Sequence, residues 1–356
     1  MSIEVTTRAY GRVNLIGEHT DYNGGWVLPT AIPQYTEVRM ERIFGNQATV
    51  ISSDDPEKHA HREYSWEIGK EKVTHTWADY LQGATRMLLE RDDKIFGFTA
   101  HIESTIPEGS GVSSSAALEM SFLQALKKMF QLDMNETELA LIGQKIENDF
   151  VGAKVGIMDQ MAVSLAKDGE ALFLDTKTLH YDRIHLPENM DLLVINSGVA
   201  HKLSAGDGGY NQRRAECEEA CRLLGIQQLR DITLEELERS KLPQHLRKRA
   251  HHVVSENARV HEAVKAIREN DLVYLGKLFN ESHRSMRDDY EVSVAEIDLL
   301  VDLTVKEQGT FGARLTGGGF GGSIVAITAK GKGDAIAEKV MKEYEHQTRI
   351  RPLRLV

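Results

Sequence analysis

The stretch FGFTAHIESTIPEGSGVSSSAALEM, residues 96–120, joins a strand pattern to a turn rich in glycine and serine and then to a helix pattern. Phe96, Phe98, Ala100 and Ile102 alternate with other residues, as in a strand with one buried face. The turn opens the helix, and such a helix N-terminus offers backbone N–H groups and the positive end of the helix dipole to a phosphate. The stretch therefore predicts a strand–loop–helix unit in a protein that mixes both kinds of element.

Strand and helix patterns also alternate along the rest of the chain. Asn135, followed three residues later by Glu138, has the pattern of a capping box and predicts a helix that begins near Glu136. Strand patterns follow at EALFLDTKTLHYDRIHL, at DLLVINSGV and after a glycine-rich stretch near the C-terminus. The helix pattern TWADYLQGATRMLLE has three side chains placed to face a core, Leu81, Met87 and Leu88. This order of elements predicts an α+β protein.

The length of 356 residues suits two domains. We place the boundary between residues 165 and 190. The chain is accordingly divided into an N-terminal domain, residues 1–175, which holds the stretches GRVNLIGEHTDYNGG and PEGSGVSSSAA, and a C-terminal α+β domain, residues 176–356, which holds TGGGFGG.

Composition and charge exclude several classes of protein. The formal net charge is −11, and an acidic surface repels nucleic acid and anionic membranes, so neither is expected as a partner. The N-terminus lacks a basic region followed by an apolar run, and no run of about 18 apolar residues occurs. Cys217 and Cys221 lie one helical turn apart among charged residues, which favours reduced thiols. We expect a cytoplasmic protein and a monomer.

The turn PEGSGVSSSAA, residues 107–117, has two interpretations. It could wrap phosphates with its backbone N–H groups and with the hydroxyls of Ser113, Ser114 and Ser115. It could equally be an ordinary turn before a helix with a serine cap. The Walker pattern GxxxxGK[ST] and the dinucleotide pattern GxGxxG are both absent, so neither a P-loop nor a nicotinamide site is favoured.

Two other glycine-rich stretches are candidates for a functional site. TGGGFGG, residues 316–322, has five glycines in seven residues, which a chain tolerates where a ligand or another backbone must approach closely. GRVNLIGEHTDYNGG, residues 11–25, begins within the strand pattern VTTRAYGRVNLIG and brings several polar side chains together near the start of the chain: Arg12, Glu18, His19, Asp21 and Tyr22.

Two carboxylates in the middle of the chain are candidates for chemistry. Asp159, in GIMDQM, lies at the expected start of a helix, where it could act as an N-cap or react. Glu147 borders an apolar helical stripe, so it could pair with a basic side chain or bind a cation, and with a serine hydroxyl near phosphates it would suit Mg²⁺. No nucleophile elbow GxSxG occurs. Three histidines on a charged helix are interpreted as solvated: His251, His252 and His261.

Together these motifs resemble one family, the galactokinases, within the GHMP kinase superfamily that also includes homoserine, mevalonate and phosphomevalonate kinases. GRVNLIGEHTDYNGG resembles the sugar signature of galactokinases, GSGVSSSAA the phosphate loop of the superfamily, and RLTGGGFGGS its third motif. GIMDQ, WADYLQG and GYNQRRAEC also resemble galactokinase patterns. The resemblance runs from about residue 8 to about residue 328 in the same order.

The resemblance implies a two-domain GHMP-kinase-like architecture with the active site in the interdomain cleft. It also implies ATP and Mg²⁺ as cofactors and carries the family's roles to matching positions. The reacting centre would hold Asp159 and Arg12; the sugar would contact Glu18, His19, Asp21, Tyr210 and the backbone of Gly156. Ser115 and Glu147 would bind Mg²⁺; the ATP phosphates would lie against Gly109, Ser110, Gly111, Val112, Ser113, Ser114 and Ser115.

The activity implied is the ATP-dependent phosphorylation of the anomeric hydroxyl of α-D-galactose, giving α-D-galactose 1-phosphate and ADP. Two alternatives stay open: a kinase of a related sugar such as N-acetylgalactosamine, and a non-catalytic sensor that binds galactose and ATP. The sequence departs from the usual family pattern at Tyr10, where proline is common, and at Val112, where leucine is common.

Overall fold

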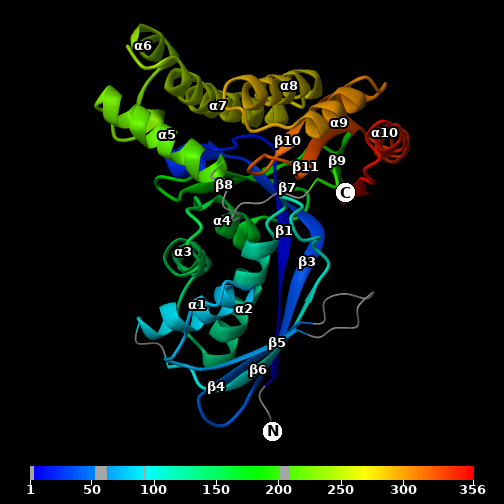
Figure 1. Ribbon diagram of the computed structural model, residues 1–356. Helices are drawn as coiled ribbons and strands as arrows, with labels where there is room; N and C mark the ends of the chain where they lie inside the picture. The colour runs from blue at the N-terminus through cyan, green and yellow to red at the C-terminus, as the bar shows by residue number, and fades with distance from the viewer. Residues whose placement is uncertain (1–3, 53–61, 92–93, 200–208) are drawn as a thin grey trace. The chain divides into compact units, whose positions relative to one another are not determined.

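The computed structural model describes residues 4–52, 62–91, 94–199 and 209–356 (Figure 1). Helices and strands are mixed along the chain, which confirms the predicted α+β class. The chain forms two compact units. Unit 1 consists of residues 1–11, 33–108 and 113–165, and unit 2 of residues 12–32, 109–112 and 166–356.

These units do not coincide with the predicted contiguous division at residue 175. Two short segments that precede this division, residues 12–32 and 109–112, pack with the C-terminal part of the chain. Both segments belong to predicted motifs, the first to the sugar motif and the second to the phosphate loop. As a statement about domains that fold independently, the division into 1–175 and 176–356 stays a prediction.

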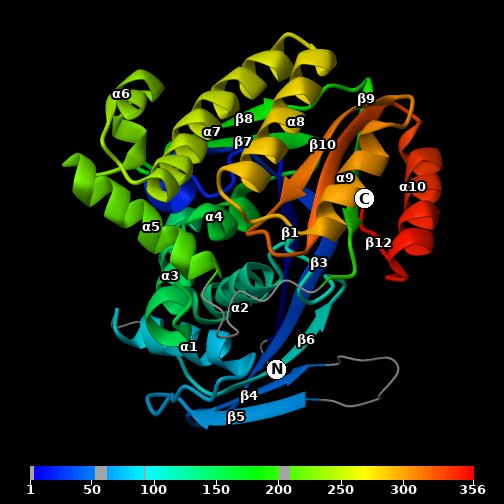
Figure 2. The ribbon, with the colours of Figure 1, turned by 45° about the horizontal axis from the view of Figure 1, so that its top comes forward.

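Unit 1 is a twisted sheet with helices on it (Figure 2). Its strands lie in the order β3-β6-β4-β5, with β1 beside β3: β1 (Glu4–Asn14), β3 (Pro29–Arg42), β4 (Gln47–Ser52), β5 (Arg62–Glu67) and β6 (Phe98–Ser104). The end of β1, from Arg12 onward, and the start of β3, up to the residue before Pro33, belong to unit 2. The helical segments are α1 (Ala78–Leu89), α2 (Ser114–Phe130), α3 (Glu136–Lys145), the π-helix η2 (Ile146–Val151) and α4 (Met158–Leu165).

The sequence patterns of unit 1 are largely confirmed. On β6, Phe98 is fully buried and its ring lies 5.6 Å from that of Phe122 on α2, as an alternating strand requires. Phe96 is an exception, because it precedes β6 and is exposed. The capping box is present: the backbone N–H of Glu138 donates to Asn135 Oδ1 at 2.9 Å, and that of Asn135 donates to Glu138 Oε2 at 2.7 Å. The three predicted core side chains of α1 are buried, Leu81, Met87 and Leu88.

Unit 2 contains a group of three antiparallel strands and a separate four-stranded antiparallel sheet. In the first, β2 (Trp26–Val27) pairs with β7 (Glu170–Asp175), and β7 pairs with β8 (Tyr181–His185). The second has the order β10-β11-β9-β12: β9 (Met190–Asn196), β10 (Thr310–Thr316), β11 (Ser323–Ala329) and β12 (Leu353–Arg354). The predicted apolar strand from Asp191 is β9, whose Leu193, Val194 and Ile195 are fully buried.

Helices of unit 2 pack on this second sheet and against one another. They are α5 (Gly209–Leu224), α6 (Leu234–Arg239), α7 (Gln244–Arg268), α8 (Leu272–Asp288), α9 (Ala295–Val305) and α10 (Gly333–Thr348), with short 3₁₀ turns η1 (Asp21–Asn23) and η3 (Leu229–Asp231). Helices α7 and α8 run side by side, and α8 and α9 contact β10 (Figures 1 and 2). Cys217 and Cys221 are buried free thiols on α5, as predicted. Among the described residues, no helix combines the length and the apolar character needed to cross a bilayer.

Candidate active site

The predicted site residues fall on both units. Unit 1 holds the serines Ser113, Ser114 and Ser115 and the groups Glu147, Gly156 and Asp159. Unit 2 holds Arg12, Glu18, His19, Asp21, Tyr210 and the loop from Gly109 to Val112.

In unit 1, the start of α2 is not an ordinary serine cap. Ser113, the residue before the helix, has φ +65°, a left-handed conformation that non-glycine residues adopt only when their surroundings enforce it. Its side chain does not cap the helix and instead donates to Asp159 Oδ2 at 2.6 Å. Asp159 lies in the first turn of α4, where the sequence places it. The strained serine therefore holds the predicted reactive carboxylate by a short, charge-assisted hydrogen bond.

Glu147 and Ser115 also come together in unit 1. Glu147 lies in the π-helix η2, a helix type that is frequent at functional sites, and its side chain is buried. Ser115 Oγ donates to Glu147 Oε1 at 3.2 Å. Burial raises the pKa of Glu147 to about 8; the charge of Asp159 adds to this shift, and the Ser115 hydroxyl opposes it. A cation beside Glu147 would offset this cost of burying a negative charge.

The donors at Ser115 and Glu147 fit Mg²⁺. Both are hard oxygens, and Mg²⁺ in phosphoryl-transfer sites takes one or two protein ligands and completes its shell with waters and substrate phosphates. In the described ranges of the chain, no cluster of three or more histidine, cysteine, aspartate or glutamate side chains could hold a metal ion by itself. The site thus suits a cation that arrives with a phosphate rather than one held by a full protein cage.

A second buried carboxylate lies near Glu147. Glu119, on α2, is fully buried, and burial together with the charge of Glu147 raises its pKa well above the ordinary value. The amide Nε2 of Gln160, on α4, donates to Glu147 Oε1 at 3.1 Å and lies 3.4 Å from Glu119 Oε2. Sequence reasoning missed both Glu119 and Gln160, although Gln160 directly follows Asp159. Gly156, in the segment before α4, is buried.

In unit 2, Arg12 contacts the part of the predicted phosphate loop that belongs to this unit, residues 109–112. Arg12 Nη1 donates to the carbonyl of Gly111 at 2.9 Å, and its backbone N–H donates to the carbonyl of Val112 at 3.1 Å. The hydroxyl of Ser323 donates to the carbonyl of Ser110 at 2.6 Å. Three contacts thus anchor residues 110–112 through their carbonyl groups.

The stretch TGGGFGG approaches the same loop. Gly317 has φ +87°, and a Cβ atom at this position would lie 2.8 Å from the carbonyl oxygen of Gly111, closer than real Cβ contacts allow. Gly319 has φ +82°, and its Cβ would lie 2.4 Å from the carbonyl oxygen of Val292. The close approach predicted from these glycines is therefore, within unit 2, an approach of backbone to backbone.

The sugar motif is tied to TGGGFGG through Glu18. Glu18 Oε1 accepts from the backbone N–H of Gly317 at 3.0 Å and from Thr316 Oγ1 at 3.2 Å, and Glu18 Oε2 accepts from Arg314. Burial raises the pKa of Glu18, and Arg314 is the main opposing influence. In this structure both carboxylate oxygens of Glu18 thus accept hydrogen bonds from protein donors.

The other residues of the sugar motif gather in an aromatic group. His19 has φ +62°, and its Nδ1 lies 2.8 Å from the Tyr22 hydroxyl. The ring of Tyr210 lies 5.5 Å from that of His19 and 5.6 Å from that of Tyr22. Asp21 begins the turn η1, and its carbonyl accepts from Thr176 Oγ1 at 3.0 Å. His19 and Tyr210, far apart in sequence, are therefore neighbours within unit 2.

Beneath the sugar motif lies a buried ionic cluster that sequence reasoning missed. Arg314, on β10, is fully buried and donates to the carbonyls of Asn14 and Leu15 at 3.2 and 2.9 Å. Glu256, on α7, is also fully buried and accepts from the backbone N–H of Gly17 at 3.0 Å. Arg259 lies 2.7 Å from Glu256, and nearby positive charge lowers the pKa of Glu256 to about 2 against the cost of burial.

His252 corrects a prediction. The sequence placed it with His251 and His261 on a solvated helix face, but it is fully buried, with Nε2 3.1 Å from the carbonyl oxygen of Glu18 and Nδ1 3.0 Å from Ser285 Oγ. Burial lowers its pKa to about 4, so it is neutral at physiological pH. The signal in the sequence was the run HHVVSEN, where apolar valines interrupt an otherwise charged helix.

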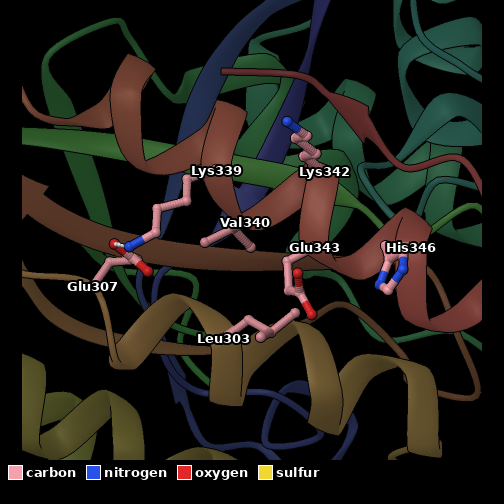
Figure 3. Close-up of a pocket in the computed structure, with 7 residues that line it drawn as sticks. All are labelled: Leu303, Glu307, Lys339, Val340, Lys342, Glu343 and His346. Atoms are coloured by element: carbon pink, nitrogen blue, oxygen red, sulfur yellow. Dashed lines mark hydrogen bonds and ion pairs between the residues drawn. The ribbon is translucent and has the colours of Figure 1, made fainter.

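A surface hollow of about 590 Å³ lies elsewhere in unit 2, against α9 and α10 (Figure 3). Lys339 and Glu307 form an ion pair of 2.8 Å beside it, and Glu343 and His346 line it as well. None of the predicted site residues lines this hollow.

Family models and known proteins match most of the chain. The family model "GHMP kinases N terminal domain" matches residues 79–167, "Galactokinase galactose-binding signature" residues 2–42, and "GHMP kinases C terminal" residues 263–346. A galactokinase of Haemophilus influenzae is 41% identical over 97% of this chain and 90% of its own length.

Two solved structures are similar. The structure of Lactococcus lactis galactokinase complexed with galactose matches with a TM-score of 0.93 and 34% identity, over 99% of this chain and 92% of that one. A Methanococcus jannaschii mevalonate kinase matches with a TM-score of 0.69 over 99% of this chain and 98% of that one. At 16% identity, this second likeness concerns the fold alone.

Proposed function

The chain belongs to the galactokinase family, and we propose that it transfers the γ-phosphoryl group of ATP to the anomeric hydroxyl of α-D-galactose, giving α-D-galactose 1-phosphate and ADP. It is a kinase, a phosphotransferase that acts on an alcohol group. The observation that carries the proposal is the sugar motif: the galactose-binding signature covers it, and its backbone and Glu18 are held by buried charged groups. Such anchoring suits a site whose hydroxyl partners must not move.

We assign the phosphates of ATP to residues 109–115. Gly109 and Gly111 have positive φ angles of +67° and +75°, which glycine adopts without strain, and α2 begins directly after this loop. The N–H groups and dipole at the start of α2 favour bound negative charge. Arg12 and Ser323 donate to carbonyl groups of the loop, and these bonds restrain its backbone.

We assign the divalent cation, Mg²⁺, to Ser115 and Glu147. Mg²⁺ supplies charge neutralisation on the phosphates when it is bound. The chain contributes two oxygens that already lie within hydrogen-bond distance of each other, so little reorganisation is required of them. Loss of the proton from Glu147 is a condition for its role, because a carboxylate and not a carboxylic acid binds a cation.

We assign Asp159 and Arg12 to the reacting centre. Phosphoryl transfer proceeds through a loose transition state, so the proton of the attacking hydroxyl leaves late and an ionised aspartate within hydrogen-bond reach is sufficient to accept it. The bond from Ser113 fixes one oxygen of Asp159, which leaves the carboxylate oriented. Arg12 would either pair with the Asp159 carboxylate or stabilise charge on the transferred group.

Galactose recognition is assigned to Glu18, His19, Asp21, Tyr210 and the backbone of Gly156. A site that hydrogen-bonds sugar hydroxyls discriminates strongly against analogues that lack one, because its own polar groups would stay unpaired. That the enzyme acts in the cytoplasm, as a monomer and without nucleic acid or a membrane as partner, stays a prediction from the sequence.

The proposal is tested by a coupled assay of ADP release with a panel of hexoses and N-acetylhexosamines, with and without Mg²⁺. We expect Mg²⁺-dependent turnover with galactose well above that with the other sugars. If kcat/KM is higher for N-acetylgalactosamine than for galactose, N-acetylgalactosamine is the preferred substrate instead. If no sugar is turned over, a non-catalytic sensor is favoured.

A further inference from the structure

We propose that Gln160 is a positioning residue for the divalent cation: its side-chain amide holds the Glu147 carboxylate in the orientation in which Glu147 and Ser115 bind the metal. The inference rests on the proposed function, because that function assigns the cation to these two residues. It adds a residue that touches neither substrate nor cation and acts through a ligand.

The geometry begins with α4. This helix carries Asp159 and Gln160 at successive positions, so Asp159 is directed toward Ser113 while Gln160 is directed toward Glu147. Gln160 Nε2 donates to Glu147 Oε1 at 3.1 Å, and Gln160 is fully buried. One helix therefore aligns both the reactive carboxylate and the carboxylate proposed as a metal ligand.

The hydrogen bonds around Glu147 leave oxygen atoms that could bind a cation. Glu147 Oε1 accepts from both Gln160 and Ser115, and within the described residues no hydrogen bond reaches Oε2. Ser115 uses its proton in this bond and keeps its lone pairs. Two hydrogen bonds to Oε1 thus restrict the rotation of the Glu147 carboxylate. Glu147 Oε2 and Ser115 Oγ, the two oxygens that a cation would need, are thereby held in position.

The orientation of the Gln160 amide follows from its neighbours. Its Nε2 lies between two carboxyl groups, of Glu147 and Glu119, and only the NH₂ end can donate to both. The other end, Oε1, is buried without a hydrogen-bond partner in the part of the chain that the structure describes. The amide is therefore oriented by the two carboxyl groups at its NH₂ end, and a side chain without this donor would leave both of them without its hydrogen bond.

Packing holds the amide in place. Gly143, on α3, faces Gln160, and a Cβ atom at Gly143 would lie 3.0 Å from Gln160 Cγ and 3.0 Å from Met120 Sδ. The absence of a side chain at Gly143 makes room for Gln160. The glutamine has little freedom to turn away from Glu147 in this setting.

The test compares Gln160→Met, which keeps an unbranched buried side chain but removes the donor, with the wild type. The binding of Mn²⁺ as a probe is measured by electron paramagnetic resonance in the presence of saturating ADP. Supporting groups behind metal ligands typically contribute about 10- to 100-fold in metal affinity, and we expect a loss of this size. The Mg²⁺ concentration that gives the half-maximal rate should rise in parallel, with kcat recovering in excess Mg²⁺.

The matched control is Gln144→Met. Gln144, on α3, donates to the carbonyl of Val155 at 3.4 Å and, among the described residues, makes no hydrogen bond to Glu147, so the Mn²⁺ affinity of this variant should stay within about twofold of the wild type. Galactose affinity, measured by calorimetry, should be unchanged in both variants. If Gln160→Met does not fold, Gln160→Leu is measured instead.

The inference is overturned if Gln160→Met binds Mn²⁺ as tightly as the wild type, or if it loses galactose and Mn²⁺ to the same extent, as a merely structural defect would require. A failure of the proposed function itself is seen in the wild type: without Mn²⁺ binding in the presence of ADP, the metal site and this inference fall together.

Discussion

Replacement of Arg314 by methionine removes the centre of the buried cluster under the sugar motif. The guanidinium donates to the carbonyls of Asn14 and Leu15, to Glu18 and to Ser282 Oγ, and it lies 3.6 Å from Glu256. Methionine retains the unbranched apolar part of the side chain. The substitution thus tests the charge and the hydrogen bonds more than the packing.

The expected loss of stability follows from the two carboxylates that remain. Removing one partner of a buried ion pair costs about 3 to 5 kcal/mol, which is a large fraction of a typical stability of about 5 to 15 kcal/mol. Glu256 keeps Arg259, but among the residues that the structure describes Glu18 has no second cationic partner. Because Arg314 is the main influence that opposes the raised pKa of Glu18, its loss should raise this pKa further. The penalty should therefore be smaller at pH 5 than at pH 8, because protonation of Glu18 relieves it.

The assay is urea unfolding followed by tryptophan fluorescence at both pH values. Arg287→Met is the matched control, because Arg287 pairs with Asp288 at 2.8 Å on an exposed surface, and such pairs contribute about 0 to 1 kcal/mol. A loss at Arg314 no larger than at Arg287, or a penalty that grows toward acid, would refute the reasoning.

Three further predictions concern single positions. Asp21→Ala should raise the KM for galactose strongly and leave the KM for ATP nearly unchanged; equal losses for both substrates in steady-state kinetics would remove Asp21 from the sugar site. Asp159→Ala should abolish turnover while calorimetry still detects galactose binding, and substantial residual turnover would contradict its role. His252 has a pKa of about 4 when folded against about 6.5 unfolded, so the unfolded chain takes up a proton first and stability falls as the pH drops below about 6.5. Between pH 7.5 and pH 5 the wild type should lose about 2 kcal/mol more than His252→Gln in urea unfolding, and parallel profiles would count against a buried neutral histidine.

Local patterns in the sequence predicted the local structure well. The capping box at Asn135, the alternation in β6 and the helix start at Asp159 depend on neighbouring residues, so they can be inferred without the fold. The motifs also identified the family, because galactokinase patterns occur in order along most of the chain.

The support of the site could not be predicted in this way. Residues 14–18 contact three side chains that lie more than 200 residues away in sequence, Arg314, Glu256 and His252. The spacing of apolar and polar residues within a short segment cannot predict such long-range contacts. Glutamate, arginine and histidine at helical spacings also usually mark a solvated face, which is why His252 was assigned wrongly. The predicted division assigns segments 12–32 and 109–112 to the first domain because it assumes contiguous domains, whereas contacts along the folded chain group both segments with unit 2.

Gln160 illustrates a further limit. Its neighbour Asp159 drew attention as a charged residue among apolar ones, and an amide beside it gave no comparable signal. Only the folded chain brings Gln160 to Glu147, through the packing of α4 against α3 at Gly143.

The central claim is that the anomeric hydroxyl of galactose receives the phosphoryl group, and the most direct measurement is NMR of the product. The purified protein is incubated with galactose, ATP and Mg²⁺, and the phosphorus–proton correlation of the sugar phosphate is recorded. We predict a single product whose phosphorus couples to the anomeric proton of the α form. A phosphorus coupled to protons at another carbon, or no sugar phosphate at all, would contradict the assignment.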